Sequence, residues 1–200
     1  MVLQRGKPNR IWGWSKPGER IEVKIGNQTA TTTTAPDGAW NLKIQPPPAG
    51  GPYHLTINGS QKLDFRNVLV GDVWLCSGQS NMEFGMSRVR DAGREIQAAD
   101  HPEIRLFTVK SGVSYSPAPT TTGLWSLCSP GTVPSFSAVG YYFGRKLHQE
   151  LHVPIGLIQA AVGGTPAESW TSEEALRPLN DFNQDLDEIV QGPQCFLAGP

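Results

Sequence analysis

The stretch "NVLVGDVWLCSGQSNMEF", residues 67–84, decides the fold of this chain of 200 residues. Its first twelve residues are almost continuously apolar, which is typical of a strand buried on both faces of a parallel sheet. The stretch then turns at Gly78 and reaches Ser80, whose position also fits the start of a helix. Because ligands of open parallel sheets bind at the carboxyl ends of the strands, Ser80 lies where a functional side chain is expected.

The chain after residue 67 alternates between candidate strands and candidate helices. The segments "IRLFTV" (104–109) and "VPIGLIQAAV" (153–162) are two further buried strands by the same apolar criterion. Residues 86–100 can form a helix or a helical connection, and residues 137–152 have helical spacing with one apolar stripe. That stripe consists of Val139, Tyr142, Phe143, Leu147 and Leu151. Strands that alternate with helices predict a doubly wound parallel α/β sheet over residues 67–200.

The first 66 residues have a different character. The segments "RIEVKIG" and "WNLKIQ" alternate apolar and polar residues, and "APDGAW" between them has the chemistry of a tight turn. Several short strands at about ten-residue spacing predict a small all-β sandwich domain over residues 1–66. Its tryptophans, Trp12, Trp14 and Trp40, either stack on sugar rings or fill the core of the sandwich.

Composition excludes several classes of function. The net charge of −1, with scattered Lys and Arg, predicts no attraction to nucleic acid or to an anionic membrane. No segment approaches the roughly 18 consecutive apolar residues of a membrane span, and "MVLQRGKPNR" lacks the pattern of a signal peptide. Cys76, Cys128 and Cys195 show no zinc-binding spacing, and nothing in the spacing supports a disulfide between the last two. We therefore expect neither a metal nor a cofactor.

Ser80 has two interpretations. The arrangement of strand, glycine turn, serine and helix suits a nucleophile, because the free N–H groups of a helix start stabilise an oxyanion. Serine is also a good helix cap, Gly78 is equally well explained as a turn residue, and Met82 replaces the last glycine of G-x-S-x-G. For one isolated junction of this kind, the helix cap is the preferred interpretation.

A second corner, "GGTPAESW" (163–170), shifts that balance. It follows another apolar strand and should lie at the same edge of the sheet. Gly163 and Gly164 let the backbone approach a ligand closely, and one of their amides could donate to an oxyanion. A plain turn explains this corner too, but two such corners at one edge favour an active site.

These motifs resemble a known family. The segments "VLVGDVWLCSGQSNMEF", "IRLFTV", "FSAVGYYFGRKL" and "VPIGLI…GGTPAESW" look like the sialate O-acetylesterase family of SGNH-type serine esterases. The opening "MVLQRGKPNRIWGWSKPGERIEV" resembles that family's N-terminal β-domain, so that the likeness runs in order from residue 1 to about residue 176. Acetyl-xylan esterases share the G-Q-S-N-M type of block, so the resemblance defines the fold more closely than the substrate.

The resemblance implies that Ser80 is the nucleophile of an esterase that removes O-acetyl groups from sialic acid or a related sugar. The residues it places at the oxyanion and substrate site are Gly78, Gln79, Asn81, Gly163 and Gly164. The amides of Ser80 and of one of the two adjacent glycines would bind the oxyanion, and the resemblance leaves open which glycine. A secreted, periplasmic or lysosomal location also follows from the resemblance only.

The histidine base of such an esterase is missing from the sequence pattern. The family carries an Asp-x-x-His block late in the chain, but no histidine here has an acid three residues earlier. The four histidines are His54, His101, His148 and His152. Asp100 and His101 precede a strand, so they should lie at the amino edge of the sheet, whereas Ser80 lies at the carboxyl edge. We therefore expect a chain without the Asp/His half of the triad, inactive by itself. The alternatives are a carbohydrate-binding module without catalysis and a degenerate, structural member of the family.

Overall fold

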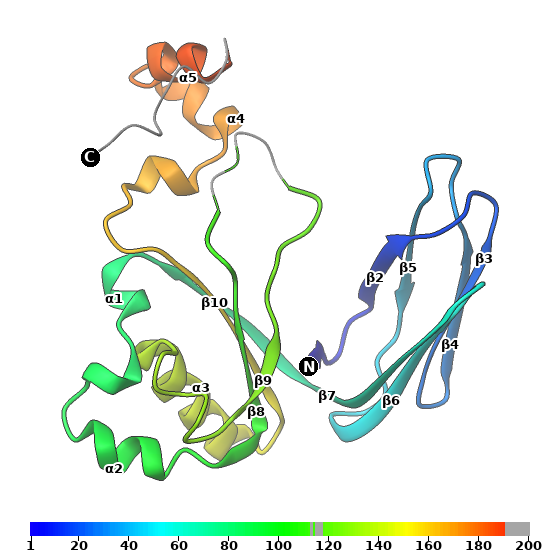
Figure 1. Ribbon diagram of the computed structural model, residues 1–200, viewed down its shortest axis with the longest axis horizontal. Coiled ribbons are helices and arrows are strands. Elements are labelled where there is room, and N and C mark those ends of the chain that lie inside the picture. The colour runs from blue at the N-terminus through cyan, green and yellow to red at the C-terminus, as the bar shows by residue number, and fades with distance from the viewer. Residues whose placement is uncertain (113, 115–117, 191–200) are drawn as a thin grey trace.

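The computed structural model of the chain describes residues 1–112, 114 and 118–190. An N-terminal β-region and an α/β region lie side by side and are joined by one long strand, β7, Lys62–Gly78 (Figure 1). The expected domain boundary after residue 66 falls inside this strand. The first half of β7 pairs with the β-region and its second half with the α/β region.

Six further strands build the β-region. They are β1 (Val2–Gln4), β2 (Asn9–Trp14), β3 (Arg20–Ile25), β4 (Gln28–Thr33), β5 (Ala39–Ile44) and β6 (Gly50–Asn58). The order β4-β3-β6-β7, with β1 beside β7, is the first part of an eight-stranded sheet that continues through β7 into the α/β region. The strands β2 and β5 pair in a separate two-stranded sheet. Both sheets contribute to one apolar cluster, in which Val23, Ile25 and Val68 are fully buried. The alternation of "RIEVKI" thus places every second residue of β3 in the core.

The tryptophans of the β-region divide between the two roles that the sequence left open. Trp40 is 7% exposed and belongs to the apolar cluster. Trp12 and Trp14 are 45% and 58% exposed and contact each other edge to face, with ring centroids 5.5 Å apart. Only Trp12 and Trp14 are therefore available to a ligand.

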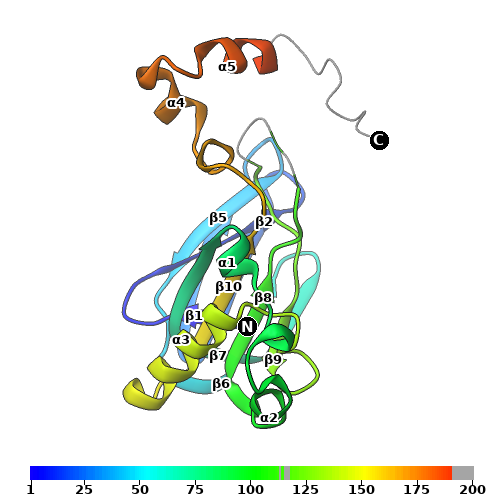
Figure 2. The same ribbon diagram turned by 90° about the vertical axis from the view of Figure 1, so that its left-hand side faces the viewer.

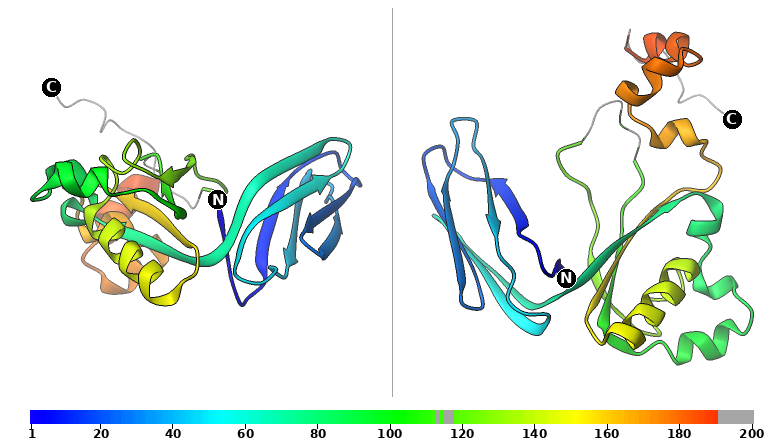
Figure 3. Two further views of the ribbon diagram at one scale, coloured as in Figure 1. Left: turned by 90° about the horizontal axis from the view of Figure 1, so that it is seen from below. Right: turned by 180° about the vertical axis from the view of Figure 1, so that it is seen from behind.

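The α/β region contains a mixed sheet. The second half of β7 pairs in parallel with β10 (Ile155–Ala161), and β10 pairs in parallel with β8 (His101–Thr108). The short strand β9 (Trp125–Cys128) adds to β8 in the antiparallel direction. The three apolar segments of the sequence are thus confirmed as neighbouring parallel strands. Figures 2 and 3 show that their carboxyl ends point the same way, toward α1 and the C-terminal helices.

Helices flank and follow this sheet. They are α1 (Ser80–Glu83), η1 (Met86–Arg88), α2 (Ala92–Gln97), α3 (Ala138–Leu151), η2 (Ala167–Trp170), α4 (Glu173–Leu176), η3 (Arg177–Leu179) and α5 (Asn183–Val190). No helix among the described residues is long and apolar enough to cross a membrane. Residues 86–100, predicted as one helix or a helical connection, form η1 and α2.

The long helix α3 buries Tyr141 and three small residues. Ala138, Gly140 and Gly144 are buried, and a Cβ atom on Gly144 would lie 2.6 Å from Leu157 Cδ1 of β10. The helix therefore approaches the sheet more closely than large side chains allow. The stripe that predicted the helix lies partly outside this contact, since Val139 and Phe143 are 51% and 41% exposed.

Candidate active site

Ser80 stands at the turn between β7 and α1. The strand ends at Gly78, whose φ of +147° favours glycine, and a Cβ atom there would lie 3.3 Å from Met82 Cβ. Gln79 occupies the helix cap, and Ser80 is the first residue inside the helix, with an exposed side chain. Ser80 is therefore not the cap of this helix, because Gln79 holds that position.

The second glycine corner lies directly beside Ser80. In the register of the two parallel strands Ala161 pairs with Gly78, and the Val162 amide donates to the Gly78 carbonyl over 3.2 Å. A Cβ atom on Gly163 would lie 3.4 Å from Ser80 Oγ. The expected meeting of the two corners at one edge of the sheet is thus observed, and Figure 1 shows β7 and β10 ending at the same edge, next to α1.

Two side chains tie the Ser80 corner to the glycine turn. The Gln79 amide donates from Nε2 to the Thr165 carbonyl over 3.3 Å. The Glu83 carboxylate accepts the Gly163 N–H over 2.7 Å. Glu83 was missed by the sequence reasoning, although Ser80 and Glu83 have the S-x-x-E spacing of a capping box. That motif predicts a carboxylate turned back on its own helix, whereas this one reaches across to the next strand.

The glycine turn is also held from its other side. The Thr165 hydroxyl donates to the Val162 carbonyl over 2.7 Å and accepts the indole N–H of Trp170 over 2.8 Å. Gly164, with φ +78°, stands in a conformation that other residues rarely adopt, and no atom lies within 4 Å of a Cβ built on it. The turn is therefore fixed at Gly163 and Thr165 and open at Gly164.

The Ser80 hydroxyl is held but not activated. Ser80 Oγ donates to Gln79 Oε1 over 3.0 Å. An amide oxygen accepts a hydrogen bond but does not take up the proton, so Gln79 cannot serve as the base that a serine nucleophile requires. Asn81 next to it is exposed and makes no hydrogen bond within the described part of the chain. Its side chain is available to a ligand.

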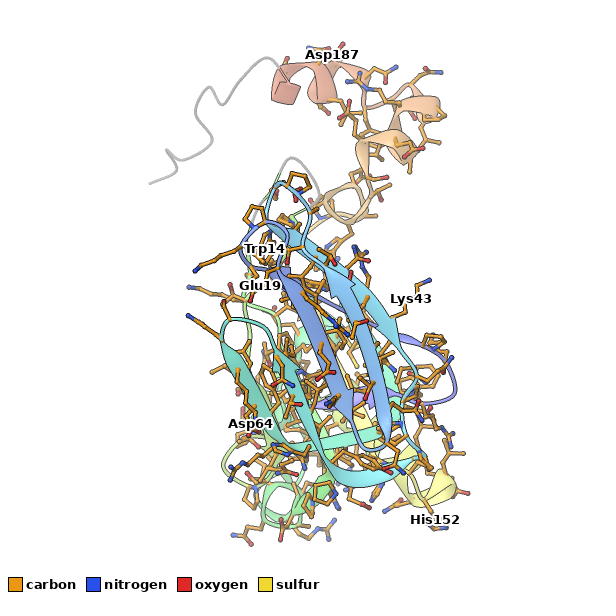
Figure 4. All side chains as sticks on the ribbon, turned by 90° about the vertical axis from the view of Figure 1, so that its right-hand side faces the viewer. Trp14, Glu19, Lys43, Asp64, His152 and Asp187 are labelled. Carbon is orange, nitrogen blue, oxygen red and sulfur yellow. The ribbon has the colours of Figure 1, made fainter. Side chains whose placement is uncertain are left out.

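None of the four histidines lies at this corner. His54 pairs with Asp64 in the β-region, and His148 contacts the Val153 carbonyl through Nδ1 over 2.9 Å. His101 opens β8, so about seven residues, roughly 23 Å of strand, separate it from the carboxyl end. His152 is the C-cap of α3, and Figure 4 shows it at the opposite end of the molecule from Asp187 of α5.

The amino edge of the sheet has a polar cluster of its own. Burial, with a smaller contribution from the Arg145 guanidinium, holds the pKa of His101 below its usual value. Arg145 donates to Glu95 over 2.9 Å, and burial raises the pKa of the Cys128 thiol to about 12. Cys76 and Cys128 are free and buried, whereas Cys195 lies outside the described residues. Because these residues are buried or bind one another, we assign the cluster a structural role.

Residues 118–124 lead into β9 beside the carboxyl end of β8, at the edge of the sheet where Ser80 lies. The Lys110 amide donates to the Thr122 carbonyl of this segment over 2.8 Å. A hollow of about 550 Å³ lies between β8 and this segment. Its lining includes Leu106, Thr108, Thr122, Leu124 and Phe136.

Comparison with known proteins identifies relatives along most of the chain. The family model described as carbohydrate esterase, sialic acid-specific acetylesterase, matches residues 70–191. Sialate O-acetylesterase of Rattus norvegicus is 32% identical over 96% of this chain and 39% of its own length. The protein of the same name from Homo sapiens is 33% identical over 88% of this chain and 38% of its own length.

A solved structure shows the same similarity in three dimensions. A carbohydrate acetylesterase from Xanthomonas citri superposes with a TM-score of 0.86 at 37% sequence identity. The match covers 88% of this chain and 41% of the Xanthomonas chain. The chain thus spans about two-fifths of the length of these relatives.

Proposed function

Because the chain belongs to the sialic acid-specific acetylesterase family of carbohydrate esterases, we propose that it carries the nucleophile of a serine esterase. The substrate is an O-acetylated sugar, either sialic acid or a related one. The observation that carries this proposal is the exposed Ser80 hydroxyl at the end of β7, against the Gly163 turn. This is the edge of a parallel sheet at which ligands bind.

The reaction we propose is acyl transfer in two steps. Ser80 Oγ attacks the acetyl carbonyl carbon while its proton passes to a base, which then delivers that proton to the departing sugar oxygen. The acetyl group stays on Ser80 until water attacks it and frees acetate and the serine hydroxyl. The tetrahedral oxyanion of each step accepts hydrogen bonds from the Ser80 amide and from one glycine amide of the 163–164 turn.

The base and the acid that orients it are proposed to come from polypeptide beyond these 200 residues. All four histidines of the chain are placed elsewhere, at the amino edge, at the end of α3 or in the β-region. Asn81, exposed beside the nucleophile, is proposed to contact the sugar. Gly78 and Gln79 shape the turn, and Gln79 orients the resting hydroxyl.

The architecture of the two regions and the location of the protein are also proposals. The shared apolar cluster supports a β-sandwich for the N-terminal region, followed by a doubly wound sheet that this chain contains in part. A secreted, periplasmic or lysosomal location is proposed from the resemblance to sialate O-acetylesterases.

The test is Ser80→Ala in the intact gene product, assayed on p-nitrophenyl acetate and on O-acetylated sialic acid. We expect kcat to fall by about 10³-fold or more, because no acyl-enzyme can form. Ser77→Ala is the matched control, since Ser77 is also an exposed serine near the end of β7. Unchanged turnover in Ser80→Ala would refute the nucleophile. The 200-residue chain assayed by itself should show little activity.

A second candidate function is carbohydrate binding by the β-region. Exposed Trp14 borders a hollow of about 410 Å³ whose rim also includes Lys16, Ser60 and Gln61. An exposed indole face with polar neighbours suits a sugar ring. Calorimetry on the whole chain with sialic acid and xylo-oligosaccharides tests this, with Trp14→Ala as the variant and Trp74→Ala as the control. Equal binding by both variants would exclude the site.

The degenerate, structural alternative is tested by a fluorophosphonate probe. The probe reacts only with an activated serine hydroxyl. If Ser80 of the intact gene product stays unlabelled under conditions that label an active serine esterase, the chain has a structural role instead.

A further inference from the structure

Glu83 has no role in the mechanism above, yet it makes the shortest contact between the nucleophile corner and the glycine turn. Resting on the proposed esterase function, we propose that Glu83 is a positioning residue of the oxyanion site. Its carboxylate holds the Gly163 N–H over 2.7 Å. The turn is thereby fixed so that Gly164, and not Gly163, supplies the second oxyanion donor beside Ser80.

The contact is built into the sequence at both of its ends. A hydrogen bond of this length to a charged acceptor is among the stronger kinds found in proteins. A Cβ atom on Gly163 would lie 2.6 Å from Glu83 Oε2, so any other residue would push the carboxylate away. Glycine at 163 is therefore explained by its contact with Glu83, and glycine at 164 by its positive φ.

The two glycine amides differ in availability. The Gly163 N–H is occupied, and an oxyanion bound there would compete with a carboxylate that repels it. The Gly164 N–H donates no hydrogen bond among the described residues, and the space next to its Cα is open. The Gly164 amide needs to release no partner before it donates to an oxyanion. The Ser80 amide has only a long contact to release, 3.4 Å to the neutral Gln79 Oε1, whereas Gly163 would have to release a carboxylate.

The position of the turn requires an acceptor at residue 83, and the charge of Glu83 strengthens that hydrogen bond. Glu83 is exposed and forms no salt bridge within the described part of the chain. A glutamine at this position has a carbonyl oxygen at the same reach, whereas alanine has no acceptor. Glu83→Gln should therefore preserve the turn, and Glu83→Ala should release it.

The first measurement is hydrogen exchange at the Gly163 amide in the 200-residue chain, with ¹⁵N-glycine labelling. Glu83→Ala should speed exchange at Gly163 by about tenfold to 100-fold, because it removes a charge-assisted hydrogen bond. Glu83→Gln, which keeps a neutral acceptor, should speed exchange by less than Glu83→Ala does, and the surface control Glu174→Ala should keep the wild-type rate. Unchanged exchange at Gly163 in Glu83→Ala would refute the contact, whatever the esterase assay gives.

The second measurement is steady-state kinetics of the same variants in the intact gene product. Glu83→Ala should lower kcat by about 10- to 100-fold with little change in KM, because a misplaced oxyanion donor acts on the transition state. Glu83→Gln should retain most of the activity. A faster Glu83→Ala enzyme would overturn the inference, since Gly163 would then be the donor that the carboxylate blocks. Loss of the esterase assignment itself would appear instead as full activity in Ser80→Ala.

Discussion

The two edges of the parallel sheet differ in how their residues are held. At the carboxyl edge, Ser80 is exposed, and its corner is connected to the neighbouring turn by one hydrogen bond that Gln79 donates and one that Glu83 accepts. At the amino edge, the Asp72 amide donates to the Pro154 carbonyl, and Arg5 binds both carboxylate oxygens of Asp72 over 2.9 Å. One edge is adjustable and accessible, and the other is packed.

The comparison shows that position along the strand decides what a residue type does. His101 at the amino edge lies against Tyr141, with ring centroids 6.2 Å apart, where it packs and has no access to Ser80. Glycine behaves in the same way. Gly71 is required by close packing, whereas Gly164 borders open space. From residue type alone, His101 would be a candidate base for Ser80, and Gly71 and Gly164 would be equivalent.

The largest effect is expected from Gly71→Ala at the packed edge. A Cβ atom on Gly71 would lie 1.8 Å from the Pro154 carbonyl oxygen, so β7 and β10 must separate. We expect a loss of about 4 kcal/mol or more in the free energy of unfolding, because the clash is with backbone in the core. Urea denaturation followed by circular dichroism measures it.

Gly93→Ala is the matched control for that change. Gly93 lies in α2, and a Cβ atom on it would meet nothing within 4 Å. Here the same substitution should stabilise the protein by about 0.5–1 kcal/mol, because alanine restricts the unfolded chain and favours a helix. A similar decrease in the free energy of unfolding in both variants would show that the close packing at Gly71 is not the cause.

Gly78→Ala is the corresponding change at the accessible edge, and its effect should be smaller. The φ of +147° is unfavourable for alanine, and the new Cβ would contact Met82 Cβ at 3.3 Å. We expect a cost of about 1–3 kcal/mol in stability, since the turn can shift into solvent. The shift should also displace Ser80, so esterase activity should fall more than stability. A variant that loses stability but keeps its esterase activity would contradict the proposed role of this turn.

Much of the fold could be predicted because it depends on long apolar segments. Residues 67–78, 104–109 and 153–162 are confirmed as parallel strands, and the meeting of Ser80 with Gly163 follows from their direction. The change in character near residue 67 was a weaker guide. The strand β7 continues through residue 67 and changes partners a few residues later, since Val70 still pairs with β6 and Asp72 is the first residue to pair with β10.

Contacts made by small residues, or by one side chain reaching across, could not be predicted. The buried residues of α3 are Ala138, Gly140, Tyr141 and Gly144, none of which belongs to the apolar stripe, so the stripe indicated the helix but not its orientation. Glu83 lies only three residues after Ser80. Its partner is 80 residues away, and no local pattern encodes that distance.

The amino edge should also make stability depend on pH. Because burial lowers the pKa of His101 in the folded state, the unfolded state binds more protons as pH falls through the usual range near 6.5. The contribution of neutral His101 is therefore present above that range and lost as pH falls through the lower, folded pKa. Denaturation at pH 7.5 and 5.5 should show a lower stability at the acid end.

His101→Asn isolates this contribution, since asparagine is polar but does not titrate. The decrease in stability between pH 7.5 and 5.5 should be smaller in this variant. His152→Asn is the control, because His152 has φ +51°, a conformation that asparagine tolerates, and it lies at the end of α3. An unchanged pH dependence in His101→Asn would show that the packed edge does not hold this histidine neutral.

The smallest expected difference between the two edges is in the accessibility of their thiols, which can be measured without any substitution. Cys128 lies at the amino edge opposite His101, is fully buried, and has a pKa raised to about 12, so at pH 8 it should resist a disulfide reagent. Cys76, near the carboxyl edge, is 5% exposed with its pKa raised by burial, and lies against Gly140 of α3. If the carboxyl edge opens more readily, Cys76 should be modified before Cys128, as measured by peptide mapping over time. Equal rates, or the reverse order, would mean that the difference between the edges stops at the surface and does not extend into the core beneath them.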